Sequence, residues 1–367
     1  MKKTITMLAL LLSASVASQA QFYKYSNEFL AIGTGARGLS MSGAVIASNS
    51  DVTSAYWNPA GLANDDKKFD LGLMHSEYFA GIAKYDYIGL ALPLQNKSLN
   101  RILAFSLIRF GVDDIPNTLF LYDPDGSINY NNITSFSVAD YAAMISYAQK
   151  LSVNGLRLGG TVKIIHRTAG NFATSWGLGL DAGIQYEKNN WRFGAIGKDI
   201  TTTFNAWSFN FTSDEQAIFA STNNVIPENS VELTSPRIIM GAAYLFSFSK
   251  TKSITLLPEI DLDLTTDGKR NVLIPGKPIS IDPRIGVEAG YKQIIYLRAG
   301  LSNFQKVSDI DSTRSLTVQP NIGVGLKIKS VTIDYALTNL GDLSGSLYSN
   351  VFSLRIALNN DKNKIIK

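Results

Sequence analysis

The stretch SWGLGLDAGIQY, residues 175–186, alternates between two kinds of side chain along its whole length. A period of two residues predicts a β-strand with one apolar face. The opposite face is built from glycines, one glutamine and one carboxylate, a composition that favours a crowded barrel interior over a water-facing sheet. The apolar set is Trp176, Leu178, Leu180, Ala182, Ile184 and Tyr186, and the other set is Gly177, Gly179, Asp181, Gly183 and Gln185.

Three further segments repeat this pattern, at 253–264, 283–291 and 316–328. The whole chain predicts about fourteen strands, each close to the roughly 9–11 residues that cross a bilayer as a tilted strand. The expected ranges are 69–76, 85–94, 101–110, 139–150, 156–166, 175–186, 191–200, 236–246, 253–264, 283–291, 294–302, 316–328, 331–338 and 350–358.

The connections between these strands alternate in length. Short links such as 151–155 and 187–190 follow the even-numbered strands, and longer ones such as 111–138 and 201–235 follow most odd-numbered strands. A soluble sandwich gives no reason to collect its long loops at one end, whereas an outer-membrane barrel has short periplasmic turns and long external loops. We therefore predict an all-β, 14-stranded antiparallel transmembrane β-barrel, with strand-end tyrosines and tryptophans as interfacial girdles. The girdle candidates are Tyr85, Tyr87, Tyr186, Trp191, Tyr244, Tyr291, Tyr296 and Tyr335.

The N-terminus predicts export. Lys2 and Lys3 precede an apolar run, and Ser18-Gln19-Ala20 supplies the small residues of a signal-peptidase site. The expected organisation is a signal peptide at 1–20, a plug segment at 21–68, a barrel at 69–359 and a periplasmic tail at 360–367. The expected location is the outer membrane of a Gram-negative bacterium, in contact with its lipid.

Composition excludes several function classes. The chain has no cysteine, which rules out thiol catalysis, thiolate metal sites and disulfides. The formal net charge of +4, of which the leader contributes two, is too small to indicate nucleic-acid binding. Only two histidines occur, His75 and His166, and neither sits in a recognisable catalytic motif, so we expect no enzyme, metal or cofactor.

The segment before the first strand does not alternate. It is rich in Gly, Ala and Ser, and it contains SAYWNPAGLA, residues 54–63, where Asn58-Pro59 favours a turn. A barrel of about fourteen strands is too wide for its own side chains to fill. We therefore interpret this segment as a plug, with Arg37, Trp57, Asn58, Pro59 and Ala60 as its key residues.

Two blocks carry a resemblance to a known family: GARGLSMSGAVIASNSDVTSAYWNPAGLA, residues 35–63, and TIDYALTNLGDLSGSLYSNVFSLRIAL, residues 332–358. They resemble the PorV/PorQ family of Bacteroidota, a branch of the FadL-type outer-membrane barrels. For PorV the resemblance implies a part in type IX protein secretion, binding cargo C-terminal domains and a large translocon barrel. For FadL-type members it implies passive uptake of hydrophobic small molecules through a lateral opening. The first function is our leading expectation and the second is the alternative.

Charged residues on the polar strand faces form a predicted lumen network. They would line a permeation path, grip the plug, or simply neutralise one another, and Arg37 is a natural plug partner for the acids. The expected members are Asp181, Glu259, Asp261, Asp263, Arg284, Glu288, Arg298, Lys327, Asp334 and Arg355.

The long external loops carry more apolar surface than water-facing loops usually do. This surface would dock a secretion partner, bind a hydrophobic ligand, or fold over the barrel mouth. The residues chosen for it are Phe120, Tyr122, Trp207, Phe209 and Phe211.

Overall fold

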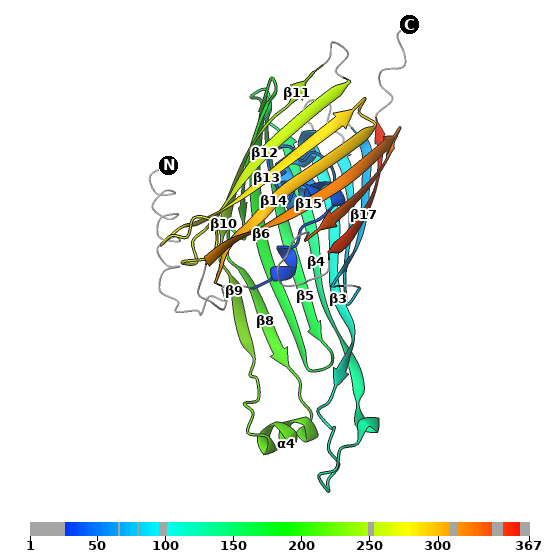
Figure 1. Ribbon diagram of the computed structural model, residues 1–367, viewed down its shortest axis with the longest axis vertical. Helices are drawn as coiled ribbons and strands as arrows, with labels where there is room; N and C mark the ends of the chain where they lie inside the picture. Colours follow the sequence, from blue (N-terminus) through cyan, green and yellow to red (C-terminus); the bar gives the residue numbers. More distant parts are fainter. Residues whose placement is uncertain are drawn as a thin grey trace.

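A computed structural model describes residues 26–64, 67–79, 81–94, 101–248, 253–308, 314–339 and 348–359. The expected signal peptide and periplasmic tail lie outside these residues. Strands dominate, and they form a barrel that encloses the N-terminal part of the described chain (Figure 1). No helix in the described ranges has the length and apolar character needed to cross a membrane.

The barrel wall is a closed antiparallel sheet of fourteen strands. Closure comes from the first and last strands, because β1 pairs with both β2 and β17. The wall strands are β1 (Lys67–Tyr78), β2 (Ala83–Leu94), β3 (Arg101–Asn117), β4 (Thr134–Lys150), β5 (Leu156–Ala169), β6 (Ala173–Lys188), β7 (Trp191–Lys198), β10 (Arg237–Tyr244, continued by β11, Phe246–Ser247), β12 (Ile254–Thr265), β13 (Ser280–Tyr291), β14 (Ile295–Ser308), β15 (Arg314–Ile328), β16 (Val331–Thr338) and β17 (Ser349–Asn359).

The alternation predicted from the sequence divides outside from inside. On β12, Ile260 is 46% exposed on the outer surface, whereas Glu259 and Asp261 are buried in the interior. The same arrangement holds on β6, where Leu178 faces outward and Asp181 faces inward. A wall with apolar side chains outside and polar ones inside matches a bilayer, because hydrocarbon surrounds it and all backbone groups pair within the closed sheet.

The prediction of one long loop over residues 201–235 is wrong in part. These residues contain β8 (Thr203–Phe209), α4 (Ser213–Ser221) and β9 (Ser230–Thr234). Strand β8 pairs with the first half of β6, while β7 pairs with its second half. The predicted strand 191–200 therefore ends at Lys198, because Asp199 and Thr202 adopt left-handed backbone conformations that turn the chain from β7 into β8.

Two arms extend from the same end of the barrel (Figure 1). One is the β8–α4–β9 hairpin, and the other is the extension of β3 and β4 with the short helix η3 (Tyr130–Asn132) between them. The connections described at the opposite end are short, as predicted: 151–155, 189–190, 292–294 and 329–330. We call the two ends the long-loop end and the short-turn end.

Residues 26–64 lie inside the barrel, and we call them the luminal segment. They form four short helical turns: η1 (Glu28–Leu30), α2 (Ala36–Ser40), α3 (Ser54–Trp57) and η2 (Pro59–Asn64). Almost every residue between Thr34 and Ala63 is buried. Strand β1 begins at Lys67, two residues before the predicted start of the barrel.

Three of the tyrosines predicted for interfacial girdles are turned into the barrel instead. Tyr85 is completely buried, and Tyr87 is 3% exposed. The hydroxyl of Tyr87 donates a hydrogen bond to the carbonyl oxygen of Val52 in the luminal segment. Tyr296 follows the inward parity of Arg298, whose guanidinium lies 5.2 Å from its ring centroid. A place near a strand end is therefore not enough to predict an interfacial tyrosine, because parity along the strand decides which face the side chain is on.

Candidate functional site

The glycines of the inward strand faces are the places where the luminal segment touches the wall. A Cβ atom at Gly159 would lie 2.4 Å from the carbonyl carbon of Pro59, and one at Gly194 would lie 2.3 Å from the carbonyl oxygen of Ile46. At Gly300 the added Cβ would lie 2.3 Å from the carbonyl carbon of Met41. Any side chain at these positions would collide with backbone. The glycine-rich faces therefore shape the wall to receive this segment.

Two carboxylates of β12 bind the backbone of the luminal segment. Asp261 Oδ2 accepts hydrogen bonds from the amides of Val45 and Ile46 at 2.9 and 3.0 Å. Glu259 Oε1 accepts from the amide of Ala47 at 2.7 Å. These amides belong to a buried, irregular stretch, so the carboxylates satisfy donors that would otherwise be costly to bury.

The predicted plug residue Arg37 bridges the segment and the wall. Its Nε donates to Glu288 Oε2 at 2.9 Å, and its other nitrogens donate to Asn49 Oδ1 and Ser48 Oγ at 3.2 Å. Glu288 also accepts from Arg298 Nε at 2.6 Å. Arg37 thus joins an ionic network of the wall to the turn at residues 48–49.

Trp57 organises the interior of the luminal segment. Its Nε1 donates to the carbonyl oxygen of Thr34 at 2.7 Å, and its indole ring packs against Gly33, Gly38 and Gly43. A Cβ atom at Gly38 would lie 2.7 Å from Trp57 Nε1. The repeated glycines of residues 33–43 therefore make room for one indole ring.

The Asn58-Pro59-Ala60 turn anchors the segment to β5, β6 and β7. Asn58 Nδ2 donates to the carbonyl oxygens of Ile46 at 3.0 Å and Ile184 at 3.2 Å. Asn58 Oδ1 accepts from the amide of Ala60 at 3.2 Å, which fixes the turn. The backbone of Pro59 lies directly over Gly159.

The predicted lumen residues divide into separate ion-pair groups. Asp181 pairs with Lys163 at 2.7 Å, Asp334 pairs with Arg298 at 2.6 Å, and Arg355 pairs with Asp70 at 2.7 Å. Asp263 pairs with Arg284 at 2.7 Å. Glu259 and Asp261 bind backbone amides instead, and Lys327, exposed at the short-turn end, joins none of these groups in the part of the chain that the structure describes.

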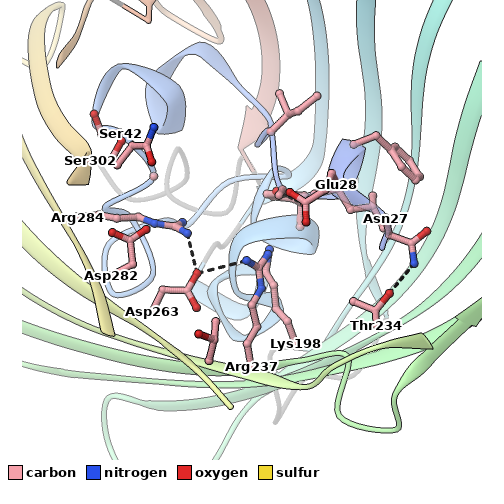
Figure 2. Close-up of a pocket in the computed structure, with 18 of the residues that line it drawn as sticks. Asn27, Glu28, Ser42, Lys198, Thr234, Arg237, Asp263, Asp282, Arg284 and Ser302 are labelled. Atoms are coloured by element: carbon pink, nitrogen blue, oxygen red, sulfur yellow. Dashed lines mark hydrogen bonds and ion pairs between the residues drawn. The ribbon is translucent and has the colours of Figure 1, made fainter. Parts of the chain in front are cut away.

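A cavity of about 680 Å³ lies inside the barrel on the long-loop side of the luminal segment (Figure 2). One part of its lining is aromatic or aliphatic, with Phe29, Leu30, Tyr56, Trp57, Phe110 and Met144. Another part is charged, with Lys198, Arg237, Asp263, Asp282 and Arg284. The cavity therefore offers an apolar surface and a polar one to the same occupant.

The charged part has three cations close together. Asp263 accepts from both Arg284, at 2.7 Å, and Arg237, at 3.3 Å (Figure 2). Lys198 is buried, and its ammonium lies 3.9 Å from the ring centroid of Tyr56. Among the described residues no carboxylate forms an ion pair with Lys198, so its ammonium can pair with an anionic group of an occupant.

Sequence reasoning missed Lys163, Lys198, Asp199 and Arg237 as site residues. Strand parity supplies the signal for Lys163, because it shares a face with Gly159 and Thr161 of β5. Lys198 and Asp199 lie at the end of β7, where the sequence pattern gave no indication of an inward turn.

The luminal segment contributes its own titratable group to the rim of the cavity. Partial burial raises the pKa of the Glu28 carboxyl, although Arg237 and Arg270 oppose the shift. The neighbouring Asn27 donates from Nδ2 to Thr234 Oγ1 at 2.8 Å (Figure 2). Residues 27–28 thus hold the first described turn of the chain against β9.

The predicted loop residues lie on the two arms. Trp207 and Phe209 stack with their ring centroids 6.2 Å apart, and Phe209 stacks on Phe211 at the same spacing. Phe120 is 39% exposed and Tyr122 is 64% exposed on the other arm. Trp207, Phe209 and Phe211 thus form one row, and Phe120 and Tyr122 lie apart from it on the other arm.

Neither histidine lies in the lumen. His75 and His166 face outward from β1 and β5, and the described residues contain no cluster of three or more potential metal ligands.

Neither a family model nor a curated protein matches the chain. Solved structures do match it. The toluene transporter TbuX of Ralstonia pickettii aligns over 89% of this chain and 99% of its own, with 13% identity and a TM-score of 0.53. The CymD monoaromatic hydrocarbon channel covers 90% and 98%, with 11% identity and a TM-score of 0.54. The P. putida toluene transporter TodX covers 89% and 99%, with 15% identity and a TM-score of 0.51. The chain therefore shares the FadL-type barrel fold of these hydrocarbon transporters.

Proposed function

We propose that the chain is an outer-membrane barrel of a Gram-negative bacterium that passes small hydrophobic molecules, with residues 26–64 as its plug. The cavity against the luminal segment is the observation that carries this proposal. It lies where a molecule entering from the long-loop end meets the segment. The fold shared with proteins named as toluene transporters and a monoaromatic hydrocarbon channel supports it.

The cavity lining narrows the range of substrate classes that we propose. The aromatic side chains Tyr56 and Trp57 accept a ring or an acyl chain, and Lys198 accepts a negative charge beside them. A hydrophobic molecule that ends in a carboxylate satisfies both. We propose this class rather than a plain hydrocarbon as the preferred substrate.

The edge of β9 supports a sideways route out of the cavity. Strand β9 pairs with β8, and no second strand pairs with it in the described part of the chain. Thr234, at the end of β9, and Arg270, in the connection after β12, both line the cavity. A substrate passing between these elements would leave the cavity sideways at the rim of the long-loop end, without passing the plug.

Cross-linking tests the plug directly, because the chain has no cysteine of its own. Ser42 Oγ accepts from Asn321 Nδ2 at 2.6 Å, so a Ser42→Cys/Asn321→Cys pair would be joined by a short thiol-reactive cross-linker that carries two maleimide groups. Cells producing the unmodified chain should take up labelled benzoate faster than cells lacking it. Cross-linking should slow this uptake if the plug moves.

Each single-cysteine variant, treated with the same reagent, is the control. Uptake equal to that of cells without the chain would refute the channel function. Uptake that the cross-link leaves unchanged would refute plug movement and favour the route at β9.

The expected role in type IX secretion remains a second candidate. It is supported by the aromatic row on the β8–α4–β9 hairpin, which projects from the long-loop end. A projecting aromatic surface is suited to docking a cargo domain or a translocon barrel. Replacing residues 210–229 with a short turn, in a strain from which the native copy is deleted, tests it through the secreted proteins. An unchanged secretome would rule it out.

A further inference from the structure

One side of the luminal cavity is lined by side chains that are polar but carry no charge. They come from three neighbouring strands, β14, β15 and β16, and from the residue that follows β16. Amides and hydroxyls donate and accept hydrogen bonds, so this side suits an uncharged polar group rather than an ion. We call it the neutral wall, and it includes Ser302, Gln305, Gln319, Asn321, Thr338 and Asn339.

Part of the neutral wall holds the fold together. Asn321 Nδ2 donates to Ser42 Oγ of the luminal segment at 2.6 Å, and Asn321 Oδ1 accepts from the amide of Asn339 at 2.9 Å. Asn339 Nδ2 donates in turn to Ser349 Oγ at 3.3 Å. These two amide side chains therefore have structural partners already.

Two hydroxyl groups of the neutral wall are not used in this way. Thr338 is 4% exposed, and its Oγ1 has no hydrogen-bond partner among the described residues. Ser302 is half-buried at the cavity, and within the described ranges its hydroxyl makes no hydrogen bond either (Figure 2). A buried hydroxyl without a partner is unfavourable, and a polar group of an occupant would remove that penalty.

The luminal segment joins the neutral wall to the aromatic side of the cavity. A Cβ atom at Gly43, next to Ser42, would lie 3.3 Å from Trp57 Cη2. The ammonium of Lys198 lies 5.8 Å from the ring of the same tryptophan. Lys198 belongs to β7, which β10, β12 and β13 separate from β14 in the barrel wall. The indole of Trp57 therefore lies between the cation of β7 and the neutral wall.

We infer that the cavity prefers aromatic acids that carry a hydroxyl group on the ring. The ring lies against Trp57, the carboxylate pairs with Lys198, and the ring hydroxyl exchanges hydrogen bonds with Ser302 and Thr338. The inference rests on the proposed function, from which it takes the carboxylate and to which it adds the hydroxyl. A site that bonds a substrate hydroxyl discriminates against an analogue without one, because its own polar groups are then left unpaired.

Equilibrium dialysis of the purified full-length barrel in detergent measures this preference. The labelled probes are benzoate, para-hydroxybenzoate and para-methylbenzoate, whose methyl group is close in size to the hydroxyl. We expect para-hydroxybenzoate to bind about tenfold more tightly than either of the others. Burial of apolar area alone gives the opposite order, with the methyl compound bound most tightly. This comparison uses the unmodified chain, so it does not depend on whether a variant folds.

A double variant tests which hydroxyl groups are responsible. Ser302→Ala/Thr338→Val removes both with little change of shape, and it should reduce the preference for para-hydroxybenzoate over benzoate to about twofold or less. The matched control is Ser330→Ala/Thr332→Val, which removes the same two groups at the short-turn end and should keep the full preference.

Equal affinities for the three acids, or tightest binding of para-methylbenzoate, would overturn the inference and leave the proposed function in place. A preference that survives in the Ser302→Ala/Thr338→Val variant would also overturn it, because the hydroxyl would then be recognised elsewhere. Absence of binding for all three acids would refute the proposed substrate class together with the inference.

Discussion

The guanidinium of Arg37 donates to Oε2 of Glu288 at 2.9 Å and ties the luminal segment to β13. Both side chains are less than a fifth exposed. Arg37→Ala would leave Glu288 with Arg298 as its remaining cation, at 2.6 Å. We expect a loss of about 3 kcal/mol in the free energy of unfolding, because one partner of a buried ion pair is removed.

Denaturant unfolding of the purified barrel measures this loss, and planar-bilayer recording should show more frequent current fluctuations as the segment loosens. Arg37→Lys keeps the charge and should recover part of the stability. Conductance traces that Arg37→Ala leaves unchanged would mean that the salt bridge does not hold the segment in place.

Two adjacent glycines give a matched test of the fit between segment and wall. A Cβ atom at Gly159 would lie 2.4 Å from the carbonyl carbon of Pro59, while at Gly160 the nearest atom, the carbonyl oxygen of Asp181, is 3.5 Å away. Gly159→Ala should cost about 1–3 kcal/mol, because backbone must shift to admit the methyl group. Gly160→Ala faces outward and should be nearly neutral. Thermal unfolding compares the two, and equal midpoints would contradict a tightly seated segment.

Lys198 provides a test of substrate charge. Lys198→Gln keeps a polar side chain, shorter by one methylene, but removes the cation beside Tyr56. Uptake of benzoate should fall about tenfold, while uptake of toluene should stay the same, because a charged hydrogen bond is lost only for the acid. Lys327→Gln, at the short-turn end, is the control. A parallel loss for both compounds would show that Lys198 has a structural role alone.

A substitution at the N-terminus of α4 tests what stabilises the helix of the projecting hairpin. Thr212 Oγ1 accepts from the amide of Glu215, and the Glu215 carboxylate accepts from the amide of Thr212. Thr212→Ala should cost the helix about 1 kcal/mol and speed amide exchange in α4 about fivefold. The barrel should keep its stability, since α4 buries no side chain. Hydrogen-exchange mass spectrometry measures the effect, and Ser221→Ala at the other end of α4 is the control.

The barrel wall could be predicted from the sequence alone, because the alternation of side chains along a strand is a local rule. Parity along a strand separates Ile260 from Asp261 whatever surrounds them, so strands, faces and the end with long loops follow from alternation. The sequence did not predict the β8–β9 hairpin. Strand β8 pairs with β6 only beyond the point where β7 ends, and nothing in the sequence pattern marks that end at Lys198. Tyr85 was assigned to a girdle from its place near a strand end, although its parity directs it inward.

The candidate site was harder to predict than the wall. Strand parity gives the face of Asp261, but its partners, the amides of Val45 and Ile46, lie more than 200 residues away in a segment without periodicity. Lys198 owes its burial to the turn at Asp199, which no alternation marks. Contacts between an irregular segment and a regular wall depend on the three-dimensional path of the segment, and one sequence does not reveal that path.

The carboxylates of β12 also bear on how the barrel assembles. The chain of the luminal segment precedes every wall strand, and the wall closes where β1, directly after that segment, meets β17. A barrel that closed while empty would lack the hydrogen bonds that Glu259 and Asp261 accept from the amides of Val45, Ile46 and Ala47. Such an empty barrel is less stable, by the loss of these contacts, than a barrel closed around the segment. The luminal segment, which precedes every wall strand, therefore acts as a core around which the last seam is closed.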